Sequence, residues 1–252
     1  MPGWDNFASY YDLYYHDRTA DIDFWVDCVT RLGFPILEFS CGTGRLTFPM
    51  ARTGASLVGL DISRQMLRYA KQRLHGESNV VKKNVTLLNG NATSFHIPHI
   101  RFRTIVCPWG FPAVTQTEQE SLFGSVNKHL LPRGHFIVDI INFQDPAADW
   151  QHFGIEDYKY FPKKKVTIIK NVFNRGSRET KIGQHLLIWD IVKEDGQMRR
   201  ILTEITERLF TKKEMERLLR QHGFTIIEEY GNYDKSRWLN TSPRTIIVAQ
   251  KE

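Results

Sequence analysis

The sequence predicts an α/β fold, in which a doubly wound, mostly parallel seven-stranded sheet carries an antiparallel β insertion before the last helix. Two changes of pattern along the chain predict it. Between residues 34 and 142 short apolar runs alternate with helical segments, which is typical of a parallel sheet covered by helices on both faces. Between residues 143 and 210 the chain has long segments rich in Val, Ile, Thr and aromatic residues, and from residue 211 the first pattern returns.

The first 33 residues predict a helical cover, because Phe7, Tyr10, Trp25 and Val29 are among aromatic and apolar residues that recur at helical spacing. The core that follows is expected to contain five buried strands and the helices between them. The expected strands are residues 35–39, 56–61, 85–88, 104–107 and 135–140, and the expected helices are residues 45–52, 64–74 and 118–130.

The insertion is expected to be antiparallel because its apolar segments, residues 165–174, 185–194 and 199–210, include Asp195-Gly196 as a hairpin turn signal. A helix over residues 212–222 and strands over residues 224–230 and 244–250 are then expected to complete the sheet. We interpret the chain as one domain in four parts: a helical cover (1–33), the core (34–142), the insertion (143–210) and the final helix and strands (211–252).

The composition is that of an ordinary globular protein, with 41% hydrophobic and 25% charged residues among 252. The sequence contains neither a signal-like N-terminus nor an apolar run of about eighteen residues, so we expect a cytoplasmic protein without membrane contact. The formal net charge is +6, but apart from the lysines at 163–165 and 82–83 the basic residues are mixed with acids. That mixing favours a solvated face over a nucleic-acid surface.

A glycine loop, residues 40–44, joins the first expected strand to the first core helix. Such a loop lets the backbone approach a ligand closely, and the N–H groups at the following helix favour a carboxylate or a phosphate. A dinucleotide fingerprint needs a third glycine where Thr47 stands. A phosphate-binding loop needs Lys-Ser or Lys-Thr where Arg45-Leu46 stands. The loop therefore matches neither pattern.

Two carboxylates beside the loop indicate a zwitterionic adenosine ligand. Glu38 ends the first strand, where a pyrophosphate would be repelled but an ammonium group could be bound. Asp61 ends the second strand, nineteen residues after Gly42, where it can accept both ribose hydroxyls.

The run Glu-Phe-Ser-Cys-Gly-Thr-Gly at 38–44, followed by Val-Gly-Leu-Asp-Ile-Ser at 58–63 and Met66-Leu67, resembles the class I S-adenosylmethionine-dependent methyltransferase family. The segment Tyr10-Tyr11-Asp12, with Tyr14 and Tyr15, resembles the part that folds over the cofactor in the small-molecule branch of that family. The resemblance covers about residues 7–142 and returns at the C-terminus. It implies a Rossmann-like fold, S-adenosylmethionine as cofactor and S-adenosylhomocysteine as product. Ser40 departs from the family's usual glycine, and Asn91 from its usual acid.

The resemblance also implies the cofactor-binding residues. The glycine loop would approach the methionyl group, Glu38 would orient its amino group, and Asp61 would hold the ribose. The stretch Asn89-Gly90-Asn91-Ala92 would contact the adenine, and Tyr15 the methionyl carboxylate. The full set of expected cofactor contacts is Tyr15, Glu38, Phe39, Ser40, Cys41, Gly42, Gly44, Asp61, Ile62, Met66, Gly90, Asn91, Ala92 and Cys107.

The expected reaction is in-line methyl transfer to a small-molecule amine, hydroxyl or carboxylate, with the insertion acting as a lid or substrate platform. His152, Asp139 and Tyr14 are candidates for a general base. Three unpaired cysteines and scattered histidines predict neither a disulfide nor a metal site. Two alternatives stay open, namely an RNA or protein acceptor and a catalytically silent cofactor-binding module. A monomer and a homodimer are both compatible with the sequence.

Overall fold

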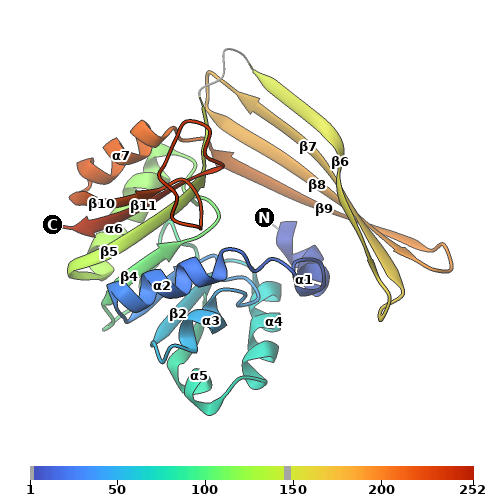
Figure 1. Ribbon diagram of the computed structural model, residues 1–252, viewed down its shortest axis with the longest axis horizontal. Helices are drawn as coiled ribbons and strands as arrows, with labels where there is room; N and C mark the ends of the chain where they lie inside the picture. Colours follow the sequence, from blue (N-terminus) through green and yellow to red (C-terminus); the bar gives the residue numbers. More distant parts are fainter. Residues whose placement is uncertain (1–2, 145–148) are drawn as a thin grey trace.

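The computed structural model describes residues 3–144 and 149–252, and its central element is a seven-stranded sheet (Figure 1). The strand order is β10-β11-β5-β4-β1-β2-β3. The five core strands pair in parallel, while β11 runs antiparallel to both β5 and β10. These strands are β1 (Ile36–Phe39), β2 (Leu57–Asp61), β3 (Val85–Asn89), β4 (Phe102–Cys107), β5 (Leu130–Ile141), β10 (Phe224–Tyr230) and β11 (Arg244–Lys251). The predicted fold class is confirmed.

Helices cover both faces of this sheet. On one face α6 and α7 pack against the strands through Phe123, Val126 and Met215. On the other face α2 and α3 contribute Trp25 and Met50 to a second buried cluster. The helices are α1 (Gly3–Tyr14), α2 (Ile22–Leu32), α3 (Thr47–Ala51), α4 (Arg64–His75), α5 (Asn79–Asn84), α6 (Gln116–His129) and α7 (Lys212–Gln221). Two-sided cover explains why β1 and β2 are buried along their whole length.

Hydroxyl caps set where several helices begin. Ser63 accepts a hydrogen bond from the Met66 N–H at the start of α4, and Thr115 and Thr211 form capping boxes at α6 and α7. Helix α5, which Ser78 caps in the same way, was not predicted from the sequence. This helix has six residues and one buried side chain, Val81, so it has no amphipathic pattern to recognise.

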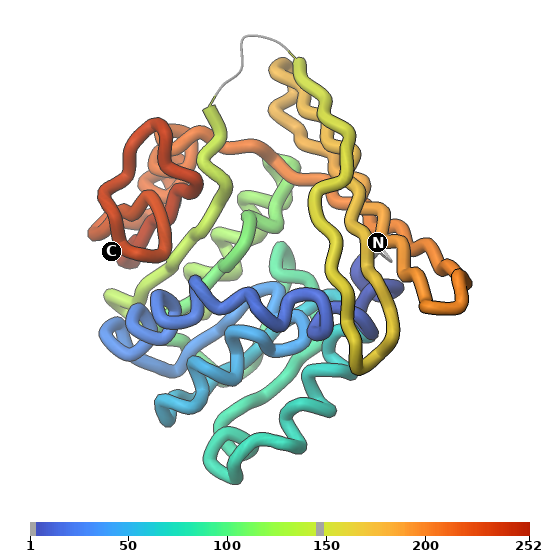
Figure 2. The backbone as a smooth tube through the Cα atoms, turned by 45° about the vertical axis from the view of Figure 1, so that its right-hand side comes forward, coloured from blue at the N-terminus to red at the C-terminus, as the bar shows by residue number. Residues whose placement is uncertain are grey.

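A four-stranded antiparallel sheet, in the order β6-β7-β8-β9, stands beside the seven-stranded sheet (Figure 2). Its strands are β6 (Trp150–Phe161), β7 (Val166–Ser177), β8 (Ile182–Lys193) and β9 (Met198–Arg208). The expected turn at Asp195-Gly196 joins β8 to β9. The sequence pattern did not predict the strand β6. Residues 145–148 lie outside the described residues.

The missed strand β6 is the edge of its sheet. Most of its side chains are exposed, and a bulge between Ile155 and Asp157 shifts the alternation of its residues by one. A regular two-residue repeat is therefore broken in the middle of the strand. For this reason β6 was not recognised by the pattern that predicted the other three strands.

Helix α1 connects the two sheets. The ring of Phe7 stacks on Trp189 of β8 with 3.8 Å between ring centroids, and the Tyr14 hydroxyl donates to Asp157 of β6 at 2.7 Å. On its other side Asp5 accepts a hydrogen bond from Ser63 at the start of α4. Among the described residues, no helix combines the length and the apolar character needed to cross a membrane.

Candidate active site

The glycine loop turns sharply at the carboxyl end of β1. Ser40, Gly42 and Gly44 all have positive φ angles, of 54°, 56° and 84°. A Cβ atom at Gly44 would lie 2.3 Å from the ring of Phe48, so glycine is required there by both conformation and space. Ser40 adopts the left-handed conformation despite its side chain, which projects from the loop and is exposed.

Asp61 fastens this loop to the end of β2. One carboxylate oxygen accepts the Gly42 N–H at 2.7 Å, and the other accepts the Ser63 N–H at 2.7 Å. Burial raises the pKa of Asp61, while these two backbone hydrogen bonds oppose the rise. Each oxygen keeps a lone pair beyond the bond it already accepts, so the carboxylate can still accept hydroxyl groups from a ligand.

Glu38 is fully inside the protein at the end of β1. It is 2% exposed and accepts a hydrogen bond from the Thr47 hydroxyl at 2.5 Å. Burial raises the pKa of Glu38 to about 8, although the Thr47 hydrogen bond and the charge of Arg45 both lower it. A cationic ligand placed beside this carboxyl would stabilise its ionised form.

A charged network next to Glu38 was not predicted. Arg45 forms a bidentate ion pair with Asp21, with hydrogen bonds of 2.7 and 2.8 Å, and the Trp109 indole N–H donates to the same carboxylate at 2.9 Å. The guanidinium of Arg18 lies 3.1 Å from the centre of the Trp109 ring. Asp21 stands in the N-cap position of α2 but makes no cap hydrogen bond. Asp21 therefore serves as an ion-pair partner and not as a helix cap.

The N-terminal helix brings its tyrosines to the same place. Tyr15 lies against Tyr11, with ring centroids 4.8 Å apart, and Arg18 lies over the Tyr15 ring at 5.3 Å. Asp12 accepts a hydrogen bond from the Thr43 hydroxyl of the glycine loop at 2.5 Å. The chain thus folds α1 over the loop, as expected for a cover of this edge.

The stretch after β3 closes the opposite end of the site. The Gly90 N–H donates to the Asp61 carbonyl at 3.0 Å, and the Asn91 side-chain oxygen accepts from the Thr93 N–H and hydroxyl. Ile62 is 63% exposed beside Asp61. The remaining expected contacts, Phe39, Cys41, Met66, Ala92 and Cys107, are buried.

The three candidate bases lie in different settings. Asp139 is completely buried and accepts from the Arg244 guanidinium, the Trp109 N–H at 3.1 Å and the Tyr233 hydroxyl at 2.8 Å. The Tyr14 hydroxyl is committed to Asp157, and burial together with that bond raises the pKa of Tyr14 strongly. His152 is exposed on β6. The structure does not bring the three together.

The cysteines are buried, and burial raises the pKa of each thiol, that of Cys28 to about 12. The Cys107 thiol donates to the Gly110 carbonyl at 3.1 Å. Thiols held in the neutral form are poor nucleophiles. Within residues 3–144 and 149–252 no group of His, Cys, Asp and Glu is arranged to hold a metal ion.

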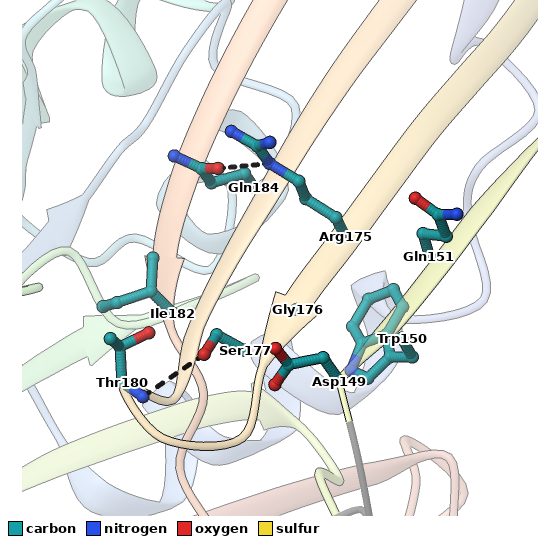
Figure 3. A pocket seen from close by; sticks show the side chains of 9 residues that line it. All are labelled: Asp149, Trp150, Gln151, Arg175, Gly176, Ser177, Thr180, Ile182 and Gln184. Carbon is teal, nitrogen blue, oxygen red and sulfur yellow. Dashed lines mark hydrogen bonds between the residues drawn. The ribbon is translucent and has the colours of Figure 1, made fainter.

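A cavity lies apart from this site, at the end of the four-stranded sheet where β6 begins and β7 ends (Figure 3). Arg175 donates to the Gln184 side chain there at 2.5 Å. Every lining residue comes from residues 149–184, so the seven-stranded sheet contributes nothing to it. They are Asp149, Trp150, Gln151, Arg175, Gly176, Ser177, Thr180, Ile182 and Gln184.

The core is similar in sequence to known methyltransferases. Residues 36–134 match the methyltransferase domain family. An uncharacterized methyltransferase of Geobacillus kaustophilus is 27% identical over 146 residues, which is 58% of this chain and 65% of that protein. The alignment therefore spans just under two thirds of that relative.

Solved structures match nearly the whole chain. The CcbJ methyltransferase from Streptomyces caelestis is 21% identical, with a TM-score of 0.82 and coverage of 98% of this chain and 96% of its own. S-adenosylmethionine-bound CalS10, an amino pentose methyltransferase from Micromonospora echinaspora, is 20% identical, with a TM-score of 0.64 and 96% coverage of both chains. Residues 36–134 therefore match a methyltransferase domain, and the chain has the fold of these S-adenosylmethionine-dependent methyltransferases of known structure.

Proposed function

We propose that this protein transfers a methyl group from S-adenosylmethionine to a small-molecule acceptor. The observation that carries the proposal is the pair of buried carboxylates flanking the glycine loop. Asp61 keeps acceptor capacity for two hydroxyls, and Glu38 has a pKa near 8 that a neighbouring cation would lower. A ligand with a ribose and an ammonium group fits both requirements.

The remaining roles follow from position. Asp61 would hold the ribose, Ile62 and the backbone at Gly90–Ala92 would contact the adenine, and Glu38 would orient the amino group. Arg18 has a guanidinium over Tyr15 and Trp109, where it would bind the methionyl carboxylate together with Tyr15. When bound here, S-adenosylmethionine would supply an activated methyl group: an acceptor lone pair would form the new bond to the methyl carbon, and the electrons of the broken carbon–sulfur bond would return to sulfur.

The protein's contribution is then alignment and exclusion of water rather than covalent chemistry. Asp139 holds Arg244 and Trp109 in place, so we assign it a structural role instead of that of a base. Tyr14 likewise joins α1 to β6. Of the three candidates, His152 keeps an exposed imidazole, on the four-stranded sheet. That CalS10 is an amino pentose methyltransferase supports a small amine-bearing molecule as the substrate.

Calorimetry with S-adenosylmethionine and S-adenosylhomocysteine tests the cofactor assignment. Asp61→Ala should weaken binding by more than about 100-fold, because two charge-assisted hydrogen bonds are each worth roughly 1.5–3 kcal/mol. Asp27→Ala is the matched control, because Asp27 is a surface acid paired with Lys235, and it should bind normally. If the wild type binds neither ligand at millimolar concentration while its fold is intact, the proposal is wrong.

A macromolecular acceptor is the second candidate. The exposed lysines 163–165 at the β6–β7 turn, and a groove on α4 lined by Arg64, Arg68, Lys71 and His75, would suit an acidic polymer such as RNA. Retention of RNA that falls steeply between low and physiological salt would favour this acceptor. No retention at low salt would exclude it. A further alternative is a cofactor-binding module without catalytic activity. Detection of methyl transfer to any acceptor in a metabolite pool would exclude it.

A further inference from the structure

The two faces of the four-stranded sheet are built from similar residues but are covered differently. Strand pairing places Ile168, Leu187, Trp189 and Ile201 on the face toward α1, where all are buried. The alternate residues form the opposite face, which we call the outer face. Its central residues are Phe153, Ile155, Tyr158, Tyr160, Ile169, Asn171, Phe173, Leu186, Ile188, Val192, Met198 and Leu202.

The outer face is apolar and open to solvent. Ile155 is 69% exposed, Phe153 67%, and Leu202, on the far edge of the sheet, 49%. None of the hydrophobic clusters formed by residues 3–144 and 149–252 includes a side chain of this face. A largely apolar surface that extends over four strands is unusual on a monomer and marks an interaction site.

The charges on the outer face are few and mostly neutralised. Arg200 pairs with Asp190 through two hydrogen bonds, at 2.7 and 2.8 Å, and Glu204 lies on the edge strand. Polar residues gather at one end, where Arg175 donates to Gln184 beside Gln151 (Figure 3). An apolar centre with a polar rim is the usual anatomy of a protein interface.

We propose that the outer face packs against the outer face of a second copy of this chain, so that the protein is a two-fold dimer. Strands about 4.8 Å apart, with residues about 3.4 Å apart along each, give this four-stranded face an area of about 800 Å². A standard interface buries about 800 Å² on each partner. The face is thus large enough to hold a stable dimer by itself.

A second copy is favoured over other occupants by shape and charge. A broad sheet face packs best against another sheet, about 10 Å away with the strands nearly aligned. A two-fold axis supplies a partner surface of the same size, flatness and apolar character, and it closes the assembly. A nucleic acid would need unpaired basic side chains in the centre of the face, where Arg200 is already neutralised by Asp190.

The oligomeric state tests this proposal and does not depend on methyl transfer. Light scattering after size exclusion should give twice the 29.5 kDa mass of the chain at micromolar concentration. The double variant Ile155→Glu and Leu202→Glu places charges in the buried interface, so its dimer dissociation constant should rise about 100-fold or more. The double variant Ile155→Thr and Leu202→Thr introduces uncharged, β-branched side chains that suit a strand, so it should weaken the dimer less.

Ile227→Glu is the matched control, because Ile227 is 41% exposed on β10, in the other sheet. It should remain dimeric, and all variants should show wild-type circular dichroism. A monomeric wild type would overturn the proposal, and so would a dimer that survives the double glutamate variant. Binding of the wild-type monomer to anionic phospholipid vesicles, abolished by the same variant, would show instead that the face is a membrane surface.

Discussion

The two sheets of this molecule differ in how their faces are covered. Helices cover both faces of the seven-stranded sheet, whereas among the described residues the four-stranded sheet has α1 on one face and solvent on the other. In the first sheet, the proposed cofactor site lies at the edge where the strands end, at Glu38 and Asp61. In the second sheet, one face packs against α1 and the other is exposed, where we propose that a partner binds. The covering helices therefore leave only the strand ends of the first sheet accessible, whereas they leave a whole face of the second accessible.

The largest effect should come from the covered face of the four-stranded sheet. Trp189→Ala removes the ring that stacks on Phe7 at 3.8 Å and leaves a cavity beneath α1. We expect a loss of about 3–5 kcal/mol in the free energy of unfolding. Leu202→Ala, on the outer face of the same sheet, should cost the monomer under about 1 kcal/mol. Thermal unfolding at low protein concentration compares them, and equal losses would contradict the assignment of the two faces.

The next effect tests the edge of the seven-stranded sheet. Gly44→Ala places a methyl group 2.3 Å from the Phe48 ring at a φ of 84°, and we expect about 3 kcal/mol of destabilisation. Gly54→Ala is the control, because Gly54 also has a positive φ but open space around it. It should cost about 1 kcal/mol. Cofactor binding, measured by calorimetry, should weaken in the first variant alone.

Local sequence was enough to predict this edge. The strand ends at Glu38 and Asp61 follow short apolar runs, and the glycines between them permit few conformations. The structure duly brings Asp61 and Gly42 into contact. Whether these residues bind S-adenosylmethionine remains a prediction for the calorimetry to test.

The parts that escaped prediction depend on contacts between distant segments. Arg45, Asp21 and Trp109 come from three separate elements, and nothing in their local patterns points to the others. Asp139, within β5, was predicted as a candidate base because its ion-pair partner, Arg244, lies 105 residues later in the sequence. The strand β6 was missed because its bulge breaks the alternation that prediction depends on.

A smaller effect concerns the charge of Glu38. Because burial raises its folded-state pKa to about 8, above the unfolded value, the stability it contributes at acidic pH is lost as pH rises toward 8. The unliganded protein should therefore unfold at progressively lower temperature from about pH 5 to about pH 8. Glu38→Gln should flatten that part of the profile.

Cofactor binding should show the opposite trend in the same range. The ammonium group of S-adenosylmethionine favours the ionised carboxylate, so affinity should rise by up to about tenfold per pH unit below 8. Calorimetry across this range measures it, with Glu38→Gln as the insensitive reference. An affinity independent of pH in the wild type would show that Glu38 does not face the ligand's amino group.

The smallest effect tests whether the adenine is contacted by the Asn91 side chain or only by the backbone around it. The Asn91 oxygen already accepts two hydrogen bonds from Thr93, and an aspartate carboxylate would accept the same two. Asn91→Asp should therefore preserve the turn and change S-adenosylmethionine affinity by less than about threefold, or under about 0.7 kcal/mol. Asn91→Ala loses both bonds and should weaken binding more. If the aspartate variant instead bound the cofactor ten times more tightly, the side chain itself would contact the adenine, and this end of the site would be more than a backbone edge.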